Sequence, residues 1–310
     1  MSTPTEPGAY ATVNKHGETD IRLWYRDAEY GHADGEPLLL IMGLNSQLIL
    51  WPDEFVRNLA DRGYRVIRFD NRDCGLSTRL DGVGPLHPVL PMCWPVMLRR
   101  PAYFLSDMAA DAAALLDRLD IEQAHIVGAS MGGMIAQLIA INHGDKVRSL
   151  CSIMSSTGDP NVGGMHDGVM AELTKPTPEG RDEAIEHITN LYRVIGSKTL
   201  AAEEEPIRKA FATASYDRMF YPQGGWRQIG AILCQSNRTA DLSELTVPTL
   251  VIHGHEDSLI DLSGGVATAE AVPESEFLHY HTMGHDLPQR LQPDIITAIA
   301  ANARSAATDT

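Results

Sequence analysis

The sequence predicts an α/β fold in which a mostly parallel central sheet carries helices on both faces and a helical cap is inserted. The apolar run at residues 37–42 lacks polar alternation, as a strand covered on both faces does, and strand patterns such as 64–70 and 249–254 alternate with helical patterns along the chain. A Gly-x-Ser-x-Gly motif at 128–132 joins a strand to a helix. The tract 156–240 lacks strand runs, so we expect a core of residues 1–155 and 241–310 and a cap of residues 156–240.

The first part of the chain is expected to start the sheet. Residues 10–15 and 21–26 are strand patterns around a turn at 16–19, which favours a hairpin. Further strands are expected at 37–42 and 64–70, with a helix near Trp51 and Pro52 between them. Ser106 is placed as the N-cap of a helix that runs to Leu119.

The second part continues the sheet and supplies the cap. Strands are expected at residues 149–154, 249–254 and 276–280. Helical patterning within the cap covers residues 181–195, 202–214 and 226–235. Pro176, Pro178, Gly180 and the run 222–225 are interpreted as breaks around these helices.

The motif at 128–132 has the pattern of a nucleophile elbow. The strand 125–127 precedes it, and apolar residues at helical spacing follow from Met134 to Ile141. Glycine is expected at 128 and 132 because a Cβ there would collide with the neighbouring strand or helix. Ser130 is therefore the candidate nucleophile, held at the tip of a strained turn.

A serine hydroxyl needs a base within hydrogen-bond reach. Among twelve histidines, His285 lies in a loop after the last apolar strand, and loops at strand ends are where open α/β sheets keep their chemistry. We expect His285 to be the base. His279 and His281 are interpreted as a strand pair with one ring packed and one solvated.

The base in turn needs an orienting acid. Asp257 follows the strand 249–254 and lies between Ser130 and His285, in the order nucleophile, acid, histidine that accompanies this motif. Asp257 is the candidate acid, with Glu256 and Asp261 as the competing carboxylates.

Attack on a carbonyl also requires N–H donors for the oxyanion. The backbone N–H of Met131 is one candidate. The second is expected in the turn Gly43-Leu44-Asn45 after the strand 37–42, and the N–H of Leu44 is chosen.

A zinc hydrolase is the alternative chemistry, because His253-x-His255-x-Asp257 imitates the start of an HxHxD zinc signature. Ser258 follows Asp257 where such sites use a further histidine, and no other Cys or His group in the sequence is expected to complete a metal shell. We therefore expect no metal and no other cofactor.

Composition limits the partners. The net charge of −16 argues against nucleic acid and against an anionic membrane surface. The N-terminus has no basic start, and no stretch reaches the roughly 18 apolar residues of a membrane span, so neither export nor membrane insertion is expected.

Four scattered cysteines without CxxC spacing favour free thiols and a cytoplasmic location. Whether the chain forms a homo-oligomer stays open.

With these residues placed, the chain resembles the α/β-hydrolase serine esterases, in particular the actinobacterial branch that includes aclacinomycin methylesterase. The matching stretches are residues 38–45, 51–55, 68–78, 247–252 and 283–285. The resemblance implies a triad of Ser130, Asp257 and His285 and an oxyanion hole of Leu44 and Met131. Residues 78–105 are longer than in that branch and the cap shows no clear match, so the methyl ester substrate does not carry over.

The expected activity is that of a cofactor-free serine carboxylesterase, which hydrolyses a small-molecule ester through an acyl-enzyme on Ser130. Opening of a lactone, including a macrolide ring ester, would use the same residues. An alternative from a different class is a non-catalytic ligand-binding protein on a hydrolase scaffold.

The segment 88–105 is rich in Met, Trp and other apolar residues. It either packs the cap onto the core or forms the wall of a lipophilic pocket, since Met and Trp suit such walls. On the second interpretation we expect a preference for bulky or hydrophobic esters, with Trp94 and Met97 as substrate contacts.

Overall fold

The computed structural model describes residues 6–83 and 101–306. The predicted contacts Trp94 and Met97 lie outside these residues and stay predictions. No helix in the described ranges combines the length and hydrophobicity that crossing a membrane requires. Cys74 and Cys151 are buried free thiols.

The described strands form one eight-stranded sheet in the order β1-β2-β4-β3-β5-β6-β7-β8. β1 and β2 form the expected antiparallel hairpin, β2 pairs antiparallel with β4, and every later pairing is parallel. The mostly parallel sheet is thereby confirmed. Its strands are β1 (Ala9–His16), β2 (Thr19–Asp27), β3 (Glu36–Ile41), β4 (Tyr64–Phe69), β5 (Ala124–Ala129), β6 (Val147–Ile153), β7 (Thr249–Gly254) and β8 (Glu276–Tyr280).

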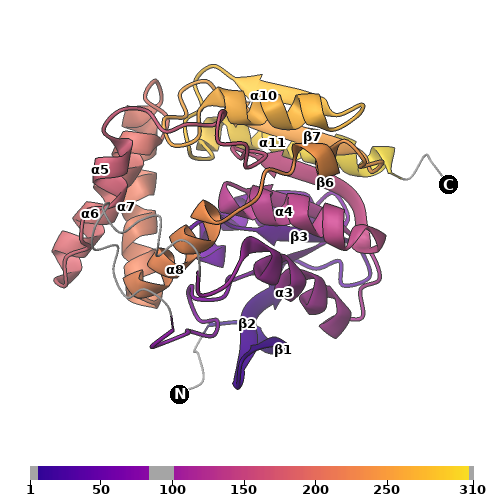
Figure 1. Cartoon of the computed structure of the whole chain (residues 1–310), viewed down its shortest axis with the longest axis horizontal. Coiled ribbons are helices and arrows are strands. Elements are labelled where there is room, and N and C mark those ends of the chain that lie inside the picture. Colours follow the sequence, from indigo (N-terminus) through magenta and orange to yellow (C-terminus); the bar gives the residue numbers. More distant parts are fainter. Residues whose placement is uncertain (1–5, 84–100, 307–310) are drawn as a thin grey trace.

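Helices cover both faces of the sheet (Figure 1), as the apolar runs predict. In β3, Leu39 and Ile41 join the core beneath α3 (Leu105–Arg118) and α4 (Met131–Asn142), whereas Leu38 and Leu40 join the core beneath α1 (Asp53–Ala60) and α11 (Gln292–Ser305). Successive side chains of a strand point to opposite faces, so a strand buried on both faces must be apolar throughout. Each such side chain contributes about 1.5–3 kcal/mol on burial.

The start of α3 differs from the prediction by two residues. The helix begins at Leu105, and Ser106 lies exposed in its first turn instead of capping it. The carboxylate of Asp107 accepts the backbone N–H of Phe104 at 2.8 Å. This charged acceptor replaces the expected serine cap at the positive end of the helix dipole.

Between β6 and β7 the described residues form helices and no strand. α5 (Val169–Leu173), α6 (Arg181–Ile195), α7 (Ala201–Arg218) and α8 (Pro222–Leu233), here called the cap helices, lie together at one side of the sheet (Figure 1). The short α9 (Thr239–Leu242) contacts α10 (Leu262–Ala271), which packs on β7 and β8.

The interpretation of 222–225 as a break is wrong, because α8 begins at Pro222 and includes both glycines. Proline is tolerated in a first helical turn, where its missing N–H has no helical partner. Gly224 lies against the chain after β4, since a Cβ on it would stand 1.9 Å from the carbonyl oxygen of Asp73. The glycines thus allow close approach of α8 to the core.

Candidate active site

Ser130 stands at the junction of β5 and α4 with φ 58° and ψ −124°, a conformation that residues other than glycine rarely adopt. A Cβ on Gly128 would lie 2.0 Å from the carbonyl oxygen of Gly132 in α4. A Cβ on Gly132 would lie 2.1 Å from the carbonyl oxygen of Ile41 in β3. The predicted collisions with helix and strand are therefore observed, and they explain why this turn needs both glycines.

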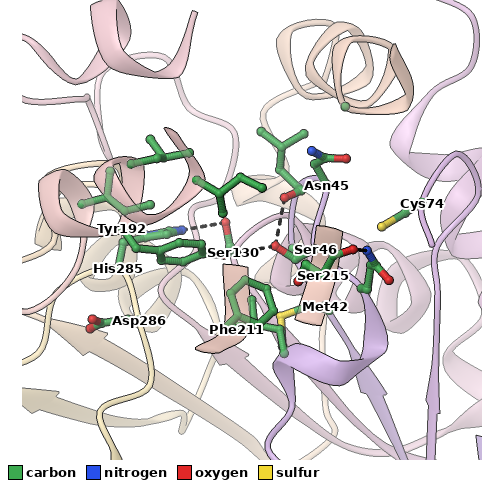
Figure 2. Close-up of a pocket in the computed structure, with 18 of the residues that line it drawn as sticks. Met42, Asn45, Ser46, Cys74, Ser130, Tyr192, Phe211, Ser215, His285 and Asp286 are labelled. Atoms are coloured by element: carbon green, nitrogen blue, oxygen red, sulfur yellow. Dashed lines mark hydrogen bonds between the residues drawn. The ribbon is translucent and has the colours of Figure 1, made fainter. Parts of the chain in front are cut away.

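The structure brings the three predicted triad residues together. The Nε2 of His285 lies 2.8 Å from Ser130 Oγ (Figure 2), and its Nδ1 lies 2.7 Å from the Oδ2 of Asp257. His285 is only 6% exposed. The two ring nitrogens therefore join the hydroxyl to the carboxylate, which is the geometry that activation of a serine requires.

The carboxylate of Asp257 is buried but well supported. Burial alone would raise its pKa, but the neighbouring His285 and His253 outweigh burial and lower the pKa to about 2. Its Oδ1 accepts the backbone N–H groups of Leu259 and Ile260, each at 2.9 Å. Asp257 thus stays ionised near neutral pH, with a fixed orientation that favours a proton on Nδ1 of His285.

The competing carboxylates have other partners. Glu256 accepts the backbone N–H groups of Lys198 at 2.6 Å and Thr199 at 3.0 Å, in the turn between α6 and α7. Asp261 caps α10 by accepting the N–H of Ser263 at 3.0 Å. Neither carboxylate has a hydrogen bond to His285 among the described residues.

Asp257→Asn is expected to lower kcat of ester hydrolysis by about 10³–10⁴-fold, because the imidazole loses its charged partner and its preferred tautomer. The matched variant Glu256→Gln should stay within about tenfold of wild type, since its carboxylate bonds only to the cap. Steady-state kinetics of both purified variants checks this pair. A larger loss for Glu256→Gln than for Asp257→Asn would show that the wrong acid was chosen.

The predicted oxyanion turn lies against the serine. A Cβ on Gly43 would stand 3.0 Å from the Cβ of Ser130 and 3.4 Å from its Oγ. Among the described residues, neither the N–H of Leu44 nor that of Met131 donates a hydrogen bond. The next N–H, of Asn45, is bound by the Oε1 of Gln228 in α8 at 2.7 Å, which fixes the turn. Two N–H groups beside Ser130 are therefore available to an oxyanion.

The loop that carries His285 is fastened to the cap helices. The backbone N–H of His285 donates to the carbonyl of Ile195 at 2.9 Å, and the N–H of Gly284 donates to Ser197 Oγ at 2.8 Å. The carboxylate of Asp286 accepts the Ser197 hydroxyl at 2.6 Å and pairs with Arg208 of α7 at 3.0 Å. Sequence reasoning missed these residues because no motif marks contacts across 78–90 residues of chain.

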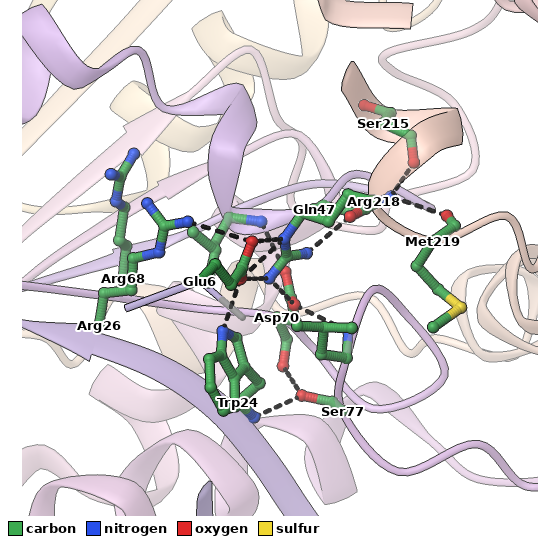
Figure 3. Close-up of polar contacts among 12 residues, drawn as sticks. Glu6, Trp24, Arg26, Gln47, Arg68, Asp70, Ser77, Ser215, Arg218 and Met219 are labelled. Atoms are coloured by element: carbon green, nitrogen blue, oxygen red, sulfur yellow. Dashed lines mark hydrogen bonds and ion pairs between the residues drawn. The ribbon is translucent and has the colours of Figure 1, made fainter. Parts of the chain in front are cut away.

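A buried ion-pair network ties the end of α7 to the core (Figure 3). Arg218 pairs with Glu6 at 2.7 Å and with Asp70 at 2.8 Å, and it donates to the Oε1 of Gln47 at 2.6 Å. Asp70 also accepts the N–H of Leu48 at 2.7 Å. The network therefore links the cap helices to the segment that follows the oxyanion turn.

A cavity of about 250 Å³ opens between the core and the cap helices, with Ser130 and His285 in its wall (Figure 2). Met42 and Leu44 line it from the core. The side chains from the cap helices and the loops beside them are mostly aromatic or aliphatic: Ile188, Leu191, Tyr192, Ile207, Phe211, Tyr216, Met219, Phe220, Tyr221, Trp226 and Ile229. Such a lining suits an apolar ligand, and none of these residues was predicted as a contact.

The HxHxD pattern does not form a shared site. His253 is buried, with Nε2 2.8 Å from the carbonyl of Ile260, whereas His255 is exposed. The interpretation of His279 and His281 as one packed and one solvated ring is also wrong, because both are exposed at the edge of the sheet. His255 instead lies beside these two rings, an arrangement that sequence reasoning did not anticipate.

Residues 36–288 match the family model described as the alpha/beta hydrolase fold. The chain therefore belongs to the α/β-hydrolase family.

Within that family the chain is similar to rhodomycin D methylesterase of Streptomyces peucetius, with 28% identity over 93% of this chain and 96% of the relative. It is also similar to a 2-hydroxy-6-oxononadienedioate/2-hydroxy-6-oxononatrienedioate hydrolase of Paraburkholderia phymatum, with 26% identity over 91% of each chain. Among solved structures, the enol-lactonase of Burkholderia xenovorans has a TM-score of 0.72 at 19% identity and covers 95% of this chain and 99% of its own. That likeness shows the shared fold.

Proposed function

We propose that this protein is a serine carboxylesterase that hydrolyses a bulky or hydrophobic small-molecule ester through an acyl-enzyme on Ser130. The observation that carries the proposal is the hydrogen-bonded series Ser130, His285 and Asp257 in the wall of an apolar cavity. The methylesterases among its relatives support ester hydrolysis as the reaction.

In the proposed reaction, His285 Nε2 takes the proton of Ser130 as Oγ attacks the ester carbonyl carbon. The N–H groups of Leu44 and Met131 bind the oxyanion of the tetrahedral intermediate, and each such donor typically lowers the barrier by about 3–4 kcal/mol. The C–O bond to the alcohol breaks, and the alcohol leaves with the proton from His285. Asp257 stabilises the imidazolium throughout.

The second half of the reaction repeats these steps with water. His285 takes a proton from the water molecule, whose oxygen attacks the acyl carbon of the Ser130 ester. The second tetrahedral intermediate uses the same two N–H groups. Its collapse releases the carboxylic acid, and the proton on His285 returns to Ser130 Oγ. No cofactor takes part in this scheme.

We further propose that residues 156–240 act as the cap that determines which esters reach Ser130, because side chains from the cap helices line the cavity. A cytoplasmic location is proposed from the scattered cysteines. The strongly negative net charge supports a small molecule, rather than nucleic acid or a membrane, as the partner.

The expected specificity is a higher kcat/KM for bulky apolar p-nitrophenyl esters than for the acetate. Phe211→Ala should lower kcat/KM for the bulky esters by about tenfold or more and leave the acetate nearly unchanged, because Phe211 is part of the apolar cavity lining that a large acyl group would fill. Phe277→Ala is the matched control, since Phe277 lies in the edge strand β8 and is absent from the cavity lining.

The same ester series separates the alternatives. Absence of turnover for every ester would favour a non-catalytic binding protein, and turnover confined to lactones would favour ring opening. Equal effects of Phe211→Ala on small and large esters would contradict the cavity as the acyl site. Trp94→Ala in the same series tests the predicted contact in 88–105.

Ester hydrolysis is expected to survive exhaustive EDTA treatment, because every group in the proposed steps is a side chain or backbone N–H of the protein and none is a metal ion. The measurement compares kcat before and after dialysis against chelator, with metal content checked by mass spectrometry. Loss of activity that only zinc restores would instead support the alternative of a zinc hydrolase that uses His253, His255 and Asp257.

A further inference from the structure

We propose that His255, His279 and His281 form a surface site for a borderline divalent metal ion such as Zn²⁺, Ni²⁺ or Cu²⁺, separate from the ester-hydrolysing residues. Each ring offers one nitrogen, and these three nitrogens lie within 4.8 Å of one another. Imidazole nitrogen is a preferred ligand of these ions. Three such nitrogens converging on one point form a coordination set that solvent can complete.

The backbone explains why the rings converge. β7 and β8 are parallel neighbours with Gly254 opposite Tyr280, so His255 leaves its strand beside His281. The N–H of His255 donates to the carbonyl of Tyr280 at 2.9 Å, which fixes this position. His279 lies in β8, and His281 is the first residue after that strand. The register of β7 against β8 thus places the backbones of the three histidines next to one another.

The side chains already contact one another. His255 Nε2 lies 2.7 Å from His279 Nδ1, and the ring centroids of His255 and His281 are 4.2 Å apart. At the tetrahedral angle, Zn–N bonds of about 2.0–2.1 Å place two ligand nitrogens of one ion about 3.4 Å apart. The widest pair, which lies within 4.8 Å, must therefore close by up to about 1.5 Å. All three rings are exposed, so side-chain rotation can supply that adjustment at little cost.

The composition of the site selects the ion. Three nitrogens without a carboxylate suit Zn²⁺, Ni²⁺ and Cu²⁺ and suit the oxygen-seeking Mg²⁺ and Ca²⁺ poorly. The net charge of −16 raises the local concentration of cations. Glu256, the residue directly after His255, carries a carboxylate. That carboxylate already accepts the backbone N–H groups of Lys198 and Thr199.

A bound ion would join the two loops of the candidate active site. Asp257 lies two residues after His255, and His285 lies four residues after His281. The two loops are already joined by the N–H of Glu256, which donates to the carbonyl of Met283 at 2.9 Å. The ion would add a second link between them, and binding to the folded chain alone would raise its thermal stability.

The test is calorimetric titration of untagged, chelator-treated full-length protein with ZnCl₂, together with thermal unfolding. We expect about one Zn²⁺ per chain, a Tm increase of about 3 °C at saturation, and no response to MgCl₂. His279→Asn and His281→Asn should each weaken zinc binding by at least about tenfold and remove the Tm shift. His32→Asn, at another exposed histidine, is the matched control and should bind zinc as wild type does.

Electron paramagnetic resonance of the Cu²⁺-loaded protein gives an independent readout. Coupling to about three imidazole nitrogens is expected in wild type, and fewer in either variant. Unchanged zinc affinity in both variants, equal loss in His32→Asn, or no binding by wild type would each overturn the proposal. Because the substituted rings are exposed, the variants should fold, which circular dichroism verifies.

Discussion

Replacing Ser130 with alanine is expected to lower kcat for ester hydrolysis by at least about 10⁴-fold, because no other group supplies the attacking oxygen. Alanine keeps the Cβ that the elbow already accommodates, so the fold should persist in spite of the positive φ of 58°. Kinetics with a p-nitrophenyl ester and a thermal melt of the same sample separate lost chemistry from lost folding.

The control for this variant is Ser106→Ala, which removes an exposed hydroxyl from α3. It should retain wild-type kcat and Tm. Activity of Ser130→Ala within tenfold of wild type, in a sample free of contaminating esterase, would refute the assignment of the nucleophile.

His285→Ala should be about as damaging, with a loss of at least about 10⁴-fold in kcat, because the hydroxyl of Ser130 then lacks the base that its high pKa requires. The vacated ring site lies between Ser130 and Asp257, so added imidazole should restore part of the activity. Rates measured at rising imidazole concentration check this expectation.

His32→Asn, on the surface, is the comparison variant and should show neither loss nor rescue. A folded His285→Ala protein with nearly normal kcat would place the base elsewhere.

Much of the catalytic geometry could be predicted because its determinants are local or follow chain order. The elbow depends on glycines two residues before and after Ser130, and their steric role is a short-range property. His285 and Asp257 each follow a strand of a parallel sheet, and the ends of parallel strands meet at one edge. Patterns along the chain therefore predict which side chains converge.

The cavity wall and the cap contacts could not be predicted in the same way. Gly224 and Gly225 resemble turn glycines in sequence, and only the packed structure shows that Gly224 is required for approach to Asp73. The Asp286 and Arg208 pair joins residues 78 positions apart. The meeting of His255 with His281 depends on the register of β7 against β8. Such tertiary contacts have no periodic signature.

The central claim, covalent catalysis by Ser130, is tested most directly by labelling with a serine-directed organophosphate. We expect intact-mass spectrometry to show about one phosphoryl group per chain, peptide mapping to place it on Ser130, and hydrolytic activity to fall in proportion to labelling. Full labelling of Ser130 with hydrolysis retained, or inactivation with the label on another residue, would contradict the account.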